Sequence, residues 1–366
     1  MSSLAAPAPS PDSAGAPDSA GAPDSPGAAE PTDATPAAAD PPPPRTPRTA
    51  WGYGLVTLRL ADGVELDTWF PHPQLGTLPP GRDPYIVPAE VEHLQGDDAR
   101  RGVRLEARTV SIDLDAPPAS TPDAYLRLHL LSHRLVQPNT INLDGVFAHL
   151  PIVMWTTAGP MHPDDFDARR PALRHEGISA IGLDKFPRLL DYVTPPHVRI
   201  ADAARVRLGA YVSPGTTVMH EGFINFNAGT LGASMVEGRI SQGVVVGDGS
   251  DIGGGASIMG TLSGGGSHRI TIGKRALLGA NSGIGISIGD DSVVEAGLYV
   301  TAGQKVVVVD SSGSPALGDD GQPRTVKAAE LSGVPGLLFR RSSLTGAVEV
   351  LPRTGAGVRL NAALHA

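Results

Sequence analysis

In the second half of the chain, aliphatic residues recur at every sixth position. A period of six fits neither an α-helix nor the alternation of an ordinary β-strand. It is typical of hexapeptide-repeat β-helices, in which three short parallel strands form one triangular coil with the aliphatic side chains inside. The pattern therefore predicts a parallel β-helix over residues 198–309, whereas a β-sandwich would show period two and hairpin turns. The repeat occupies four registers: Ile200, Val206, Val212, Val218, Ile224; Ile240, Val246, Ile252, Ile258; Ile272, Leu278, Ile284; and Ile288, Val294, Val300, Val306.

Glycine often follows the repeated aliphatic residue, where little side chain fits at a tight corner of the coil. The register is interrupted between Ile224 and Ile240 and between Ile258 and Ile272, and it shifts by four positions after Ile284. These breaks predict loops or bulges. The glycine pairs are Val246-Gly247, Ile252-Gly253, Ile272-Gly273, Leu278-Gly279 and Ile288-Gly289.

Residues 50–195 show a different pattern. Alternating apolar residues on both sides of Ala61-Asp62-Gly63 predict a β-hairpin. Leucines at helical spacing predict a helix over residues 124–136, opened by Pro122, and a second helix is expected at about 184–192. We interpret this part as a compact N-terminal α/β or α+β domain without recognisable chemistry of its own.

The two ends of the chain differ from both domains. Residues 1–48 are rich in Pro and Ala and contain no aromatic residue, so they predict a disordered tail rather than a signal peptide. Residues 310–322 read as a polar loop and 326–331 as a short helix, followed by strands at 337–339 and 347–351. The last of these elements lie in the C-terminal segment, residues 323–366.

Composition excludes several classes of function. The chain has no cysteine, which rules out disulfides, thiolate catalysis and zinc-thiolate sites. A net charge of -9 offers no basic footprint for nucleic acid, and no apolar run is long enough to span a membrane. We therefore expect a soluble, cytoplasmic protein that binds small molecules.

Three stretches depart from the plain repeat, at residues 219–227, 235–240 and 263–268, and irregularity within a repeat is where function tends to lie. With two further strings they resemble the tetrahydrodipicolinate N-succinyltransferases of the actinobacterial type, over residues 51–365. The strings are His220-Glu221-Gly222-Phe223, Val236-Glu237-Gly238-Arg239-Ile240-Ser241, Gly253-Gly254-Gly255-Ala256-Ser257-Ile258-Met259-Gly260 and Glu295-Ala296-Gly297-Leu298-Tyr299-Val300.

The resemblance implies a mainly β protein with a left-handed parallel β-helix, an N-terminal α/β domain and a short C-terminal segment. It implies a homotrimer with active sites at subunit interfaces. The implied reaction moves succinyl from the co-substrate succinyl-CoA to the amine of acyclic tetrahydrodipicolinate (L-2-amino-6-oxopimelate). The product is N-succinyl-2-amino-6-oxopimelate, an intermediate of lysine and diaminopimelate biosynthesis.

Glu237 is the candidate catalytic residue. An ammonium must lose a proton before it attacks a thioester, and a carboxylate in a partly desolvated cleft can accept that proton. The resemblance implies that this glutamate is essential, as the base or as the nucleophile of an acyl anhydride; a solvated Glu237–Arg239 ion pair is the structural alternative. Arg239 itself suits a substrate carboxylate, since guanidinium binds carboxylates through two parallel hydrogen bonds.

The remaining candidate residues would bind the substrate or succinyl-CoA. Gly254 and Ser257 lie in a glycine-rich corner that can present N–H and hydroxyl donors. The resemblance places the coenzyme A groove at Ala280, Glu295, Ala296 and Gly303, and places cationic and hydroxyl groups for the phosphates at Lys327, Arg340, Arg341, Ser342 and Ser343.

The resemblance also suggests a Mg²⁺ site made by an acidic pair near the trimer axis, with Glu221 as one member. Ala204 occupies the partner position, and Asp202 is nearby but out of register. This departure argues against the metal, so Glu221 is kept only as a candidate ligand beside the alternative of a hydrated carboxylate.

Three other functions fit parts of the pattern. A γ-type carbonic anhydrase needs three histidines for zinc, but the β-helix offers only His220 and His268. Another hexapeptide acyltransferase, dependent on acetyl-CoA, could use His268 as its base. A non-catalytic β-solenoid scaffold would explain the repeat, but it would leave Glu237, Arg239 and the cationic C-terminal segment unexplained.

Overall fold

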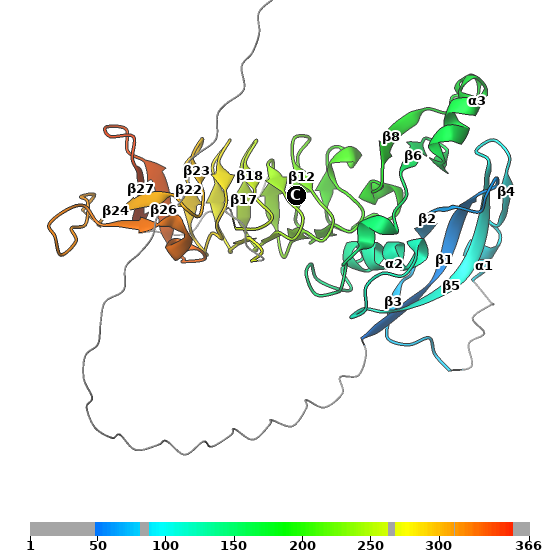
Figure 1. Ribbon diagram of the computed structural model, residues 1–366, viewed down its shortest axis with the longest axis horizontal. Helices are drawn as coiled ribbons and strands as arrows, with labels where there is room; N and C mark the ends of the chain where they lie inside the picture. The colour runs from blue at the N-terminus through cyan, green and yellow to red at the C-terminus, as the bar shows by residue number, and fades with distance from the viewer. Residues whose placement is uncertain (1–47, 81–87, 263–267, 311, 354–366) are drawn as a thin grey trace, which may run out of the picture. The chain divides into compact units, whose positions relative to one another are not determined.

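The computed structural model describes residues 48–80, 88–262, 268–310 and 312–353 (Figure 1). The predicted tail over residues 1–48 lies outside the described residues except for Arg48, as does most of the irregular stretch 263–268 and the end of the C-terminal segment beyond Arg353. Residues 46–366 belong to one compact unit. Within the described residues no helix has the length and apolar character needed to cross a membrane.

The N-terminal domain is built on an antiparallel sheet in the order β2-β1-β5-β4. Its predicted hairpin is confirmed: β1 (Thr49–Arg59) pairs antiparallel with β2 (Glu65–Trp69), and Gly63 in the turn has a φ of 75°. Because helix α2 (Thr121–Ser132) packs on a sheet of antiparallel strands, the domain is α+β rather than α/β. The other elements are β3 (Gln74–Leu75), α1 (Ala89–Glu92), β4 (Gly96–Asp98) and β5 (Val103–Asp113).

Helix α2 begins and ends earlier than the leucine spacing predicts. The Ser120 side chain caps it by accepting from the amide of Asp123 at 3.3 Å, with Pro122 in the first turn. The helix ends before residue 136 because Arg134 adopts a left-handed φ of 61°. Its arginine, Arg127, is fully buried and pairs with Asp123 at 2.7 Å.

The prediction of a second helix at about residues 184–192 is wrong. Asp184 ends strand β8 (Ala180–Asp184), and only the 3₁₀ turn η2 (Leu189–Asp191) follows. Pro187 explains this, because it has no N–H to donate and disfavours helical geometry at Phe186. A helix that the pattern did not predict, α3 (Pro163–His175), lies beside a small sheet of β6 (Val153–Thr156), β7 (Gly159–Met161) and β8; η1 (Val146–Ala148) precedes it.

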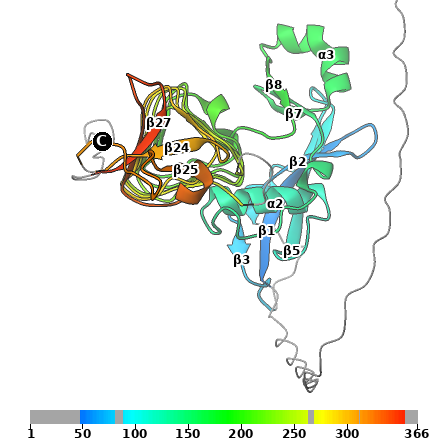
Figure 2. The ribbon, with the colours of Figure 1, turned by 60° about the vertical axis from the view of Figure 1, so that its left-hand side comes forward.

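The predicted β-helix is confirmed, and Figure 2 shows its coils stacked one behind another. Its strands form three parallel faces. The first face contains β9 (Arg199–Ile200), β11 (Thr217–Val218), β14 (Ser234–Val236), β17 (Ser250–Ile252), β20 (Leu277–Leu278) and β22 (Val293–Val294). The second face contains β12 (Phe223–Ile224), β15 (Arg239–Ile240), β18 (Ser257–Ile258), β21 (Gly283–Ile284) and β23 (Tyr299–Val300). The third face contains β10 (Tyr211–Val212), β13 (Gly229–Thr230), β16 (Val245–Val246) and β19 (Thr271–Ile272); the 3₁₀ turn η3 (Ala203–Arg205) lies in the first coil.

The repeat positions fill the interior of the prism. All of them are buried except Ile200, which is half-buried at the first coil. The first interruption of the repeat is not a loop, because Thr230 and Val236 continue it and are both buried. Thr230 satisfies its hydroxyl inside the core through a 2.7 Å hydrogen bond with the Thr216 hydroxyl, which explains why no aliphatic residue marks this position.

At two corners the spacing between repeat positions falls from six residues to four. These corners lie between Val236 and Ile240 and between Ile284 and Ile288. The second interruption is a loop as predicted, since β18 ends at Ile258 and β19 begins only at Thr271. The short corner after Val236 holds Glu237.

The C-terminal segment folds back onto the last coils. Strand β26 (Leu337–Arg341) extends the first face by pairing in parallel with β22, and β27 (Val348–Pro352) pairs antiparallel with β26. The predicted strands are therefore confirmed. The predicted helix starts later, as the 3₁₀ turn η4 (Ala328–Leu331), because the preceding residues form β25 (Thr325–Lys327) against β24 (Lys305–Val308).

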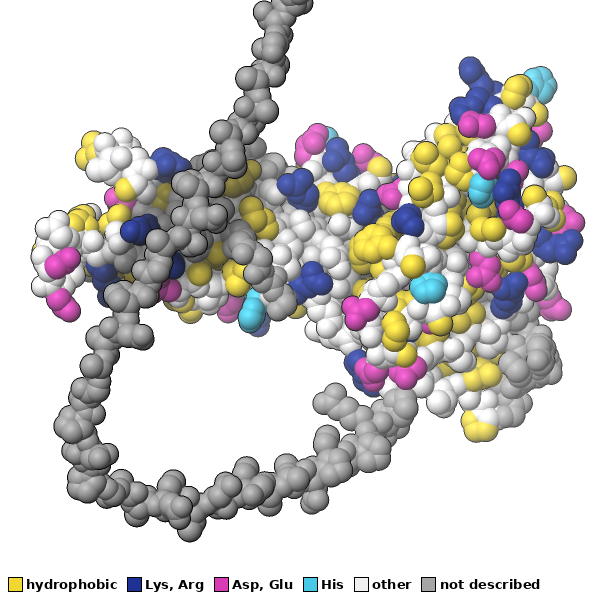
Figure 3. All heavy atoms as spheres, in the orientation of Figure 1, with side chains coloured by type: hydrophobic (Ala, Val, Ile, Leu, Met, Phe, Trp, Pro, Cys, Tyr) yellow, Lys and Arg dark blue, Asp and Glu magenta, His cyan; other side chains and the backbone are white. Residues whose placement is uncertain are grey.

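Charged side chains of both signs are interspersed over the face of the N-terminal domain that Figure 3 shows. Arginines of this domain pair with nearby carboxylates, for example Arg59 with Asp165 at 2.8 Å and Arg104 with Asp97 at 2.7 Å. Such exposed or partly exposed pairs contribute little to stability, so the domain depends mainly on its apolar core.

Close packing of the coils predicts a cost for side chains at the glycine corners. A methyl group at Gly247 would lie 2.6 Å from the carbonyl carbon of Gly273 in the next coil, and backbone cannot move aside. We expect Gly247→Ala to lower the free energy of unfolding by about 1–3 kcal/mol, measured by urea denaturation. Gly303→Ala is the control, because no atom lies within 4 Å of the added methyl group. Equal stability of the two variants would contradict the packing argument.

Candidate active site

Six predicted site residues lie along one edge of the β-helix, between the first and second faces. Successive corners are joined there by backbone hydrogen bonds: Gly255 N–H to Glu237 O at 3.3 Å, Asn281 N–H to Gly254 O at 2.8 Å, and Gly297 N–H to Ala280 O at 2.8 Å. Residues distant in sequence are thus stacked one coil apart. We call this edge the corner column; it contains Glu221, Glu237, Gly254, Ala280, Glu295 and Ala296.

Glu237 is positioned by its shortened corner. The amides of Glu237 and Gly238 both donate to the carbonyl of Ile252, at 2.9 and 3.0 Å, which fixes the backbone of this corner to the next coil. Gly254 is its neighbour, since Glu237 Oε2 lies 3.5 Å from the point that a Cβ at residue 254 would occupy, which is an ordinary van der Waals distance. The half-buried carboxylate therefore lies against the glycine-rich corner.

Arg239 and Ser257 are neighbours on the second face. The two residues are register partners on β15 and β18, and Arg239 Nη2 donates to Ser257 Oγ at 2.5 Å. Among the described residues Arg239 therefore binds Ser257 rather than forming the alternative ion pair with Glu237. The exposed guanidinium is held in place while keeping further donors for a carboxylate.

Sequence reasoning missed Tyr299, which lies on the same face. Its ring covers Gly283, since a Cβ at that glycine would lie 2.1 Å from the ring, and its side chain is 54% exposed. The available signal was an aromatic residue at an outward position of the repeat, in register with the small residues Ser257 and Gly283 on the two preceding coils and with Phe223 at the start of the face.

A cleft of about 300 Å³ lies at the far end of the corner column, lined by Glu295, Ala296, Arg341 and Ser343. The amide of Arg341 donates to Glu295 Oε2 at 2.6 Å, so the C-terminal segment is attached directly to the column. The structure thus brings these predicted coenzyme A residues together.

The two adjacent arginines have different surroundings. Arg340 forms an ion pair with Glu349 at 3.0 Å, whereas Arg341 Nη1 donates to the carbonyl of Gly346 at 2.9 Å and is exposed beside the cleft. The surroundings of Arg340 and Arg341 differ because successive side chains of a β-strand point to opposite faces of the sheet. Ser342 uses its hydroxyl to accept from the amide of Thr345 at 3.3 Å.

Gly303 and Lys327 lie elsewhere, at the edge that follows the second face. Gly303 is in the corner after Val300, and Lys327 is the register partner of Lys305 on the neighbouring strand. The amide of Ala328 donates to the carbonyl of Gln304 at 2.8 Å, which links this pair. The predicted binding residues therefore form two groups, on opposite sides of the second face.

Glu221 does not fit a magnesium site within one chain. Its carboxylate lies 3.6 Å from Arg205 Nη2, and the same arginine lies 3.8 Å from Asp202. Arg205 thus already supplies positive charge between the two acids, and Ala204 offers no ligand. The described residues contain no group of three His, Asp or Glu side chains that could hold a metal ion.

His268, the alternative base, is exposed in the loop between β18 and β19. That loop leaves the β-helix between the second and third faces, away from the corner column. The arrangement does not place His268 beside Glu237 or Arg239.

Two family models match the chain: the hexapeptide repeat of succinyl-transferase at residues 269–302, and the tetrahydrodipicolinate N-succinyltransferase middle region at residues 150–188. A 2,3,4,5-tetrahydropyridine-2,6-dicarboxylate N-succinyltransferase from Salinispora tropica is 56% identical over 328 residues, which cover 88% of this chain and 99% of the relative. The chain belongs to this N-succinyltransferase family. The protein of the same name from Pseudomonas paraeruginosa is 55% identical over 254 residues, covering 69% of this chain and 72% of the relative.

A solved structure from Campylobacter jejuni, described as a 2,3,4,5-tetrahydropyridine-2-carboxylate N-succinyltransferase, matches with a TM-score of 0.70. It is 31% identical and covers 83% of this chain and 92% of its own. These matches confirm the predicted family, the prediction that the chain is an N-succinyltransferase, and the fold class, a left-handed parallel β-helix between an N-terminal domain and a short C-terminal segment.

The surroundings of Glu221 predict that this N-succinyltransferase is indifferent to Mg²⁺. We expect EDTA and MgCl₂ to leave its melting temperature and its rate of CoA release unchanged, because Arg205 already places a positive charge beside both acidic residues at this position. Ala204→Asp restores the acidic partner that the resemblance implies, so its melting temperature should rise with Mg²⁺. A loss of stability or activity of the wild type in EDTA would show that the site is complete without that partner.

Proposed function

We propose that the protein transfers the succinyl group of succinyl-CoA to the amine of acyclic tetrahydrodipicolinate, giving N-succinyl-2-amino-6-oxopimelate. The observation that carries the proposal is the juxtaposition of Glu237 with Arg239, Ser257 and Gly254 on consecutive coils, together with membership of the family. A carboxylate for proton or acyl transfer and a guanidinium for a dicarboxylate are the groups that this reaction needs.

The chemical step exchanges one acyl bond for another. The amine nitrogen attacks the thioester carbonyl, a C–N bond forms, the C–S bond breaks, and coenzyme A leaves as its thiol. Glu237 either accepts the proton of the amine, or first attacks the thioester itself to form a mixed anhydride, whose succinyl carbonyl the amine then attacks so that the Glu237 carboxylate is released. Both routes need its carboxylate at the reacting carbonyl, and they differ in whether coenzyme A is released before the amine arrives.

Arg239 binds a carboxylate in this proposal, and the 2.5 Å hydrogen bond that its Nη2 donates to Ser257 Oγ orients it. Coenzyme A extends along the β-helix toward Arg341 and Ser343, where the cleft ends the corner column. Because the second face is open between the two groups of binding residues, we propose that a neighbouring subunit of a homotrimer covers it and completes the site.

Replacing the catalytic carboxylate should abolish turnover without loss of fold. We expect Glu237→Gln to lower kcat by about a hundred- to ten-thousandfold, measured by thiol release from succinyl-CoA with tetrahydrodipicolinate present. Glu176→Gln, on an exposed residue after α3, is the control. A stoichiometric burst of coenzyme A in wild type without acceptor would identify the anhydride route. Full activity of Glu237→Gln would overturn the assignment.

The two adjacent arginines should contribute unequally to coenzyme A binding. We expect Arg341→Ala to raise the KM for succinyl-CoA about two- to tenfold, with little change in kcat, because its guanidinium lies beside the cleft. Arg340→Ala should raise it less, because Glu349 already pairs with this arginine. The difference should shrink at high salt. A larger effect at Arg340 would contradict the proposed path.

A further inference from the structure

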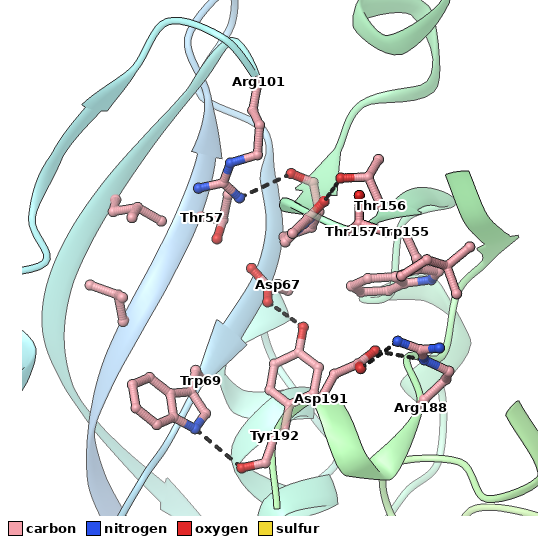
Figure 4. Close-up of a pocket in the computed structure, with 15 residues that line it drawn as sticks. Thr57, Asp67, Trp69, Arg101, Trp155, Thr156, Thr157, Arg188, Asp191 and Tyr192 are labelled. Atoms are coloured by element: carbon pink, nitrogen blue, oxygen red, sulfur yellow. Dashed lines mark hydrogen bonds and ion pairs between the residues drawn. The ribbon is translucent and has the colours of Figure 1, made fainter. Parts of the chain in front are cut away.

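A second cavity lies in the N-terminal domain, far along the chain from the corner column. It has a volume of about 540 Å³, within the range of small-molecule sites. Its walls are formed by β1, β2 and β5 on one side and by β6, β7, β8 and η2 on the other (Figure 4). None of the proposed transfer residues lines it.

Asp67 is the central polar group of this cavity. It is 4% exposed, and its Oδ1 is buried without a hydrogen-bond partner. Its Oδ2 accepts a hydrogen bond from the Tyr192 hydroxyl, toward which it points in Figure 4. Burying a carboxylate oxygen without a hydrogen-bond donor costs free energy, so a donor supplied by a bound ligand would stabilise Asp67.

The electrostatics of Asp67 agree with this geometry. Burial raises the pKa of its carboxyl, and the neighbouring Thr57, Tyr192 and Arg101 only partly oppose that effect. Hydrogen-bonding neighbours therefore do not replace the water that the carboxylate has lost. A cation in the cavity would do so, because an opposite charge at short range favours the ionised form.

Two arginines supply the opposite charge at the cavity wall. Arg101 is 6% exposed; its Nε donates to Asp98 at 2.8 Å and its Nη1 reaches the carbonyl of Pro160 at 3.4 Å. Arg188 lies across the cavity and is paired with Asp191 at 2.6 Å. A guanidinium has five donors, so Arg101 retains N–H groups for a carboxylate on a ligand.

The rest of the lining is aromatic and apolar. Trp69 and Trp155 face the interior in Figure 4. Leu55 and Leu105 of the sheet also line the cavity. Trp69 is fixed by a 3.3 Å hydrogen bond from Nε1 to the carbonyl of Tyr192, and Trp155 by a 2.9 Å hydrogen bond to the carbonyl of Asp184. Fixed indole rings suit both an apolar side chain and an ammonium.

We propose that this cavity is a binding site for a free amino acid, separate from the site of succinyl transfer. The ammonium of the ligand pairs with the carboxylate of Asp67, its carboxylate accepts from Arg101, and its side chain lies against Trp69 and Trp155. The proposal depends on the geometry of the N-terminal domain and does not require the proposed transfer reaction.

The test uses the full-length protein and the standard L-amino acids, each added alone at millimolar concentration. Two of the three tryptophans line the cavity, so binding should change intrinsic fluorescence as well as raise the melting temperature. We expect at least one amino acid to bind, and Asp67→Asn to bind it about ten- to a hundredfold more weakly. The control is Glu65→Gln, a carboxylate on the same strand that does not line the cavity.

A second comparison does not depend on the folding of the Asp67→Asn variant. The 2-hydroxy acid that matches the bound amino acid keeps its carboxylate and side chain but has no ammonium, so it should bind the wild type at least about tenfold more weakly. Absence of binding by every amino acid would overturn the proposal. So would equal binding of the hydroxy acid, or unchanged binding by a folded Asp67→Asn variant, which would place the ligand elsewhere, for instance at the transfer site.

Discussion

The hydrogen-bond ladder between successive coils is the constraint on which the active site depends. Each corner donates to a carbonyl of the neighbouring coil, as Gly297 does to Ala280 and Asn281 to Gly254. The ladder holds backbones so close that a side chain is excluded at several corners, which is why glycine recurs there. It also converts positions about one coil apart in sequence into immediate neighbours in space. A column of functional groups thus follows from backbone pairing, before any side-chain interaction is considered.

A regular hexapeptide repeat places every side chain by the same rule and leaves little room for a reactive group at its corners. The corner at Glu237, where the spacing of the repeat falls from six residues to four, provides that room. Shortening the corner directs two successive amides to one carbonyl, that of Ile252, and places a carboxylate where the next two corners have Gly253 and Gly279. The same contraction after Ile284 carries no such acid. The contraction therefore creates the space, and the residue at that position determines whether the space is used.

The interior of the β-helix could be predicted from sequence because one simple rule, an aliphatic residue in each strand, governs it. Glu237, Arg239, Gly254 and Ser257 were predictable as a group because they interrupt that rule and resemble a known family. Thr230 was missed because it satisfies its hydroxyl internally and thus replaces an aliphatic residue without breaking the coil. The N-terminal domain has no repeat, and the lining of the Asp67 cavity comes from strands between Leu55 and Tyr192 that only tertiary packing brings together.

An acidic chain that handles acidic substrates must place its few cations with care. Several arginines of the described structure are neutralised locally, as Arg340 is by Glu349 and Arg205 is by its acidic neighbours. Arg239 and Arg341 differ, because their side chains are exposed at the second face and the cleft and bond to a hydroxyl and a carbonyl instead of a carboxylate. Their positive charge is therefore retained for a ligand. Binding of anionic substrates depends on which arginines lack an acidic partner, and the net charge of -9 is a poor guide to it.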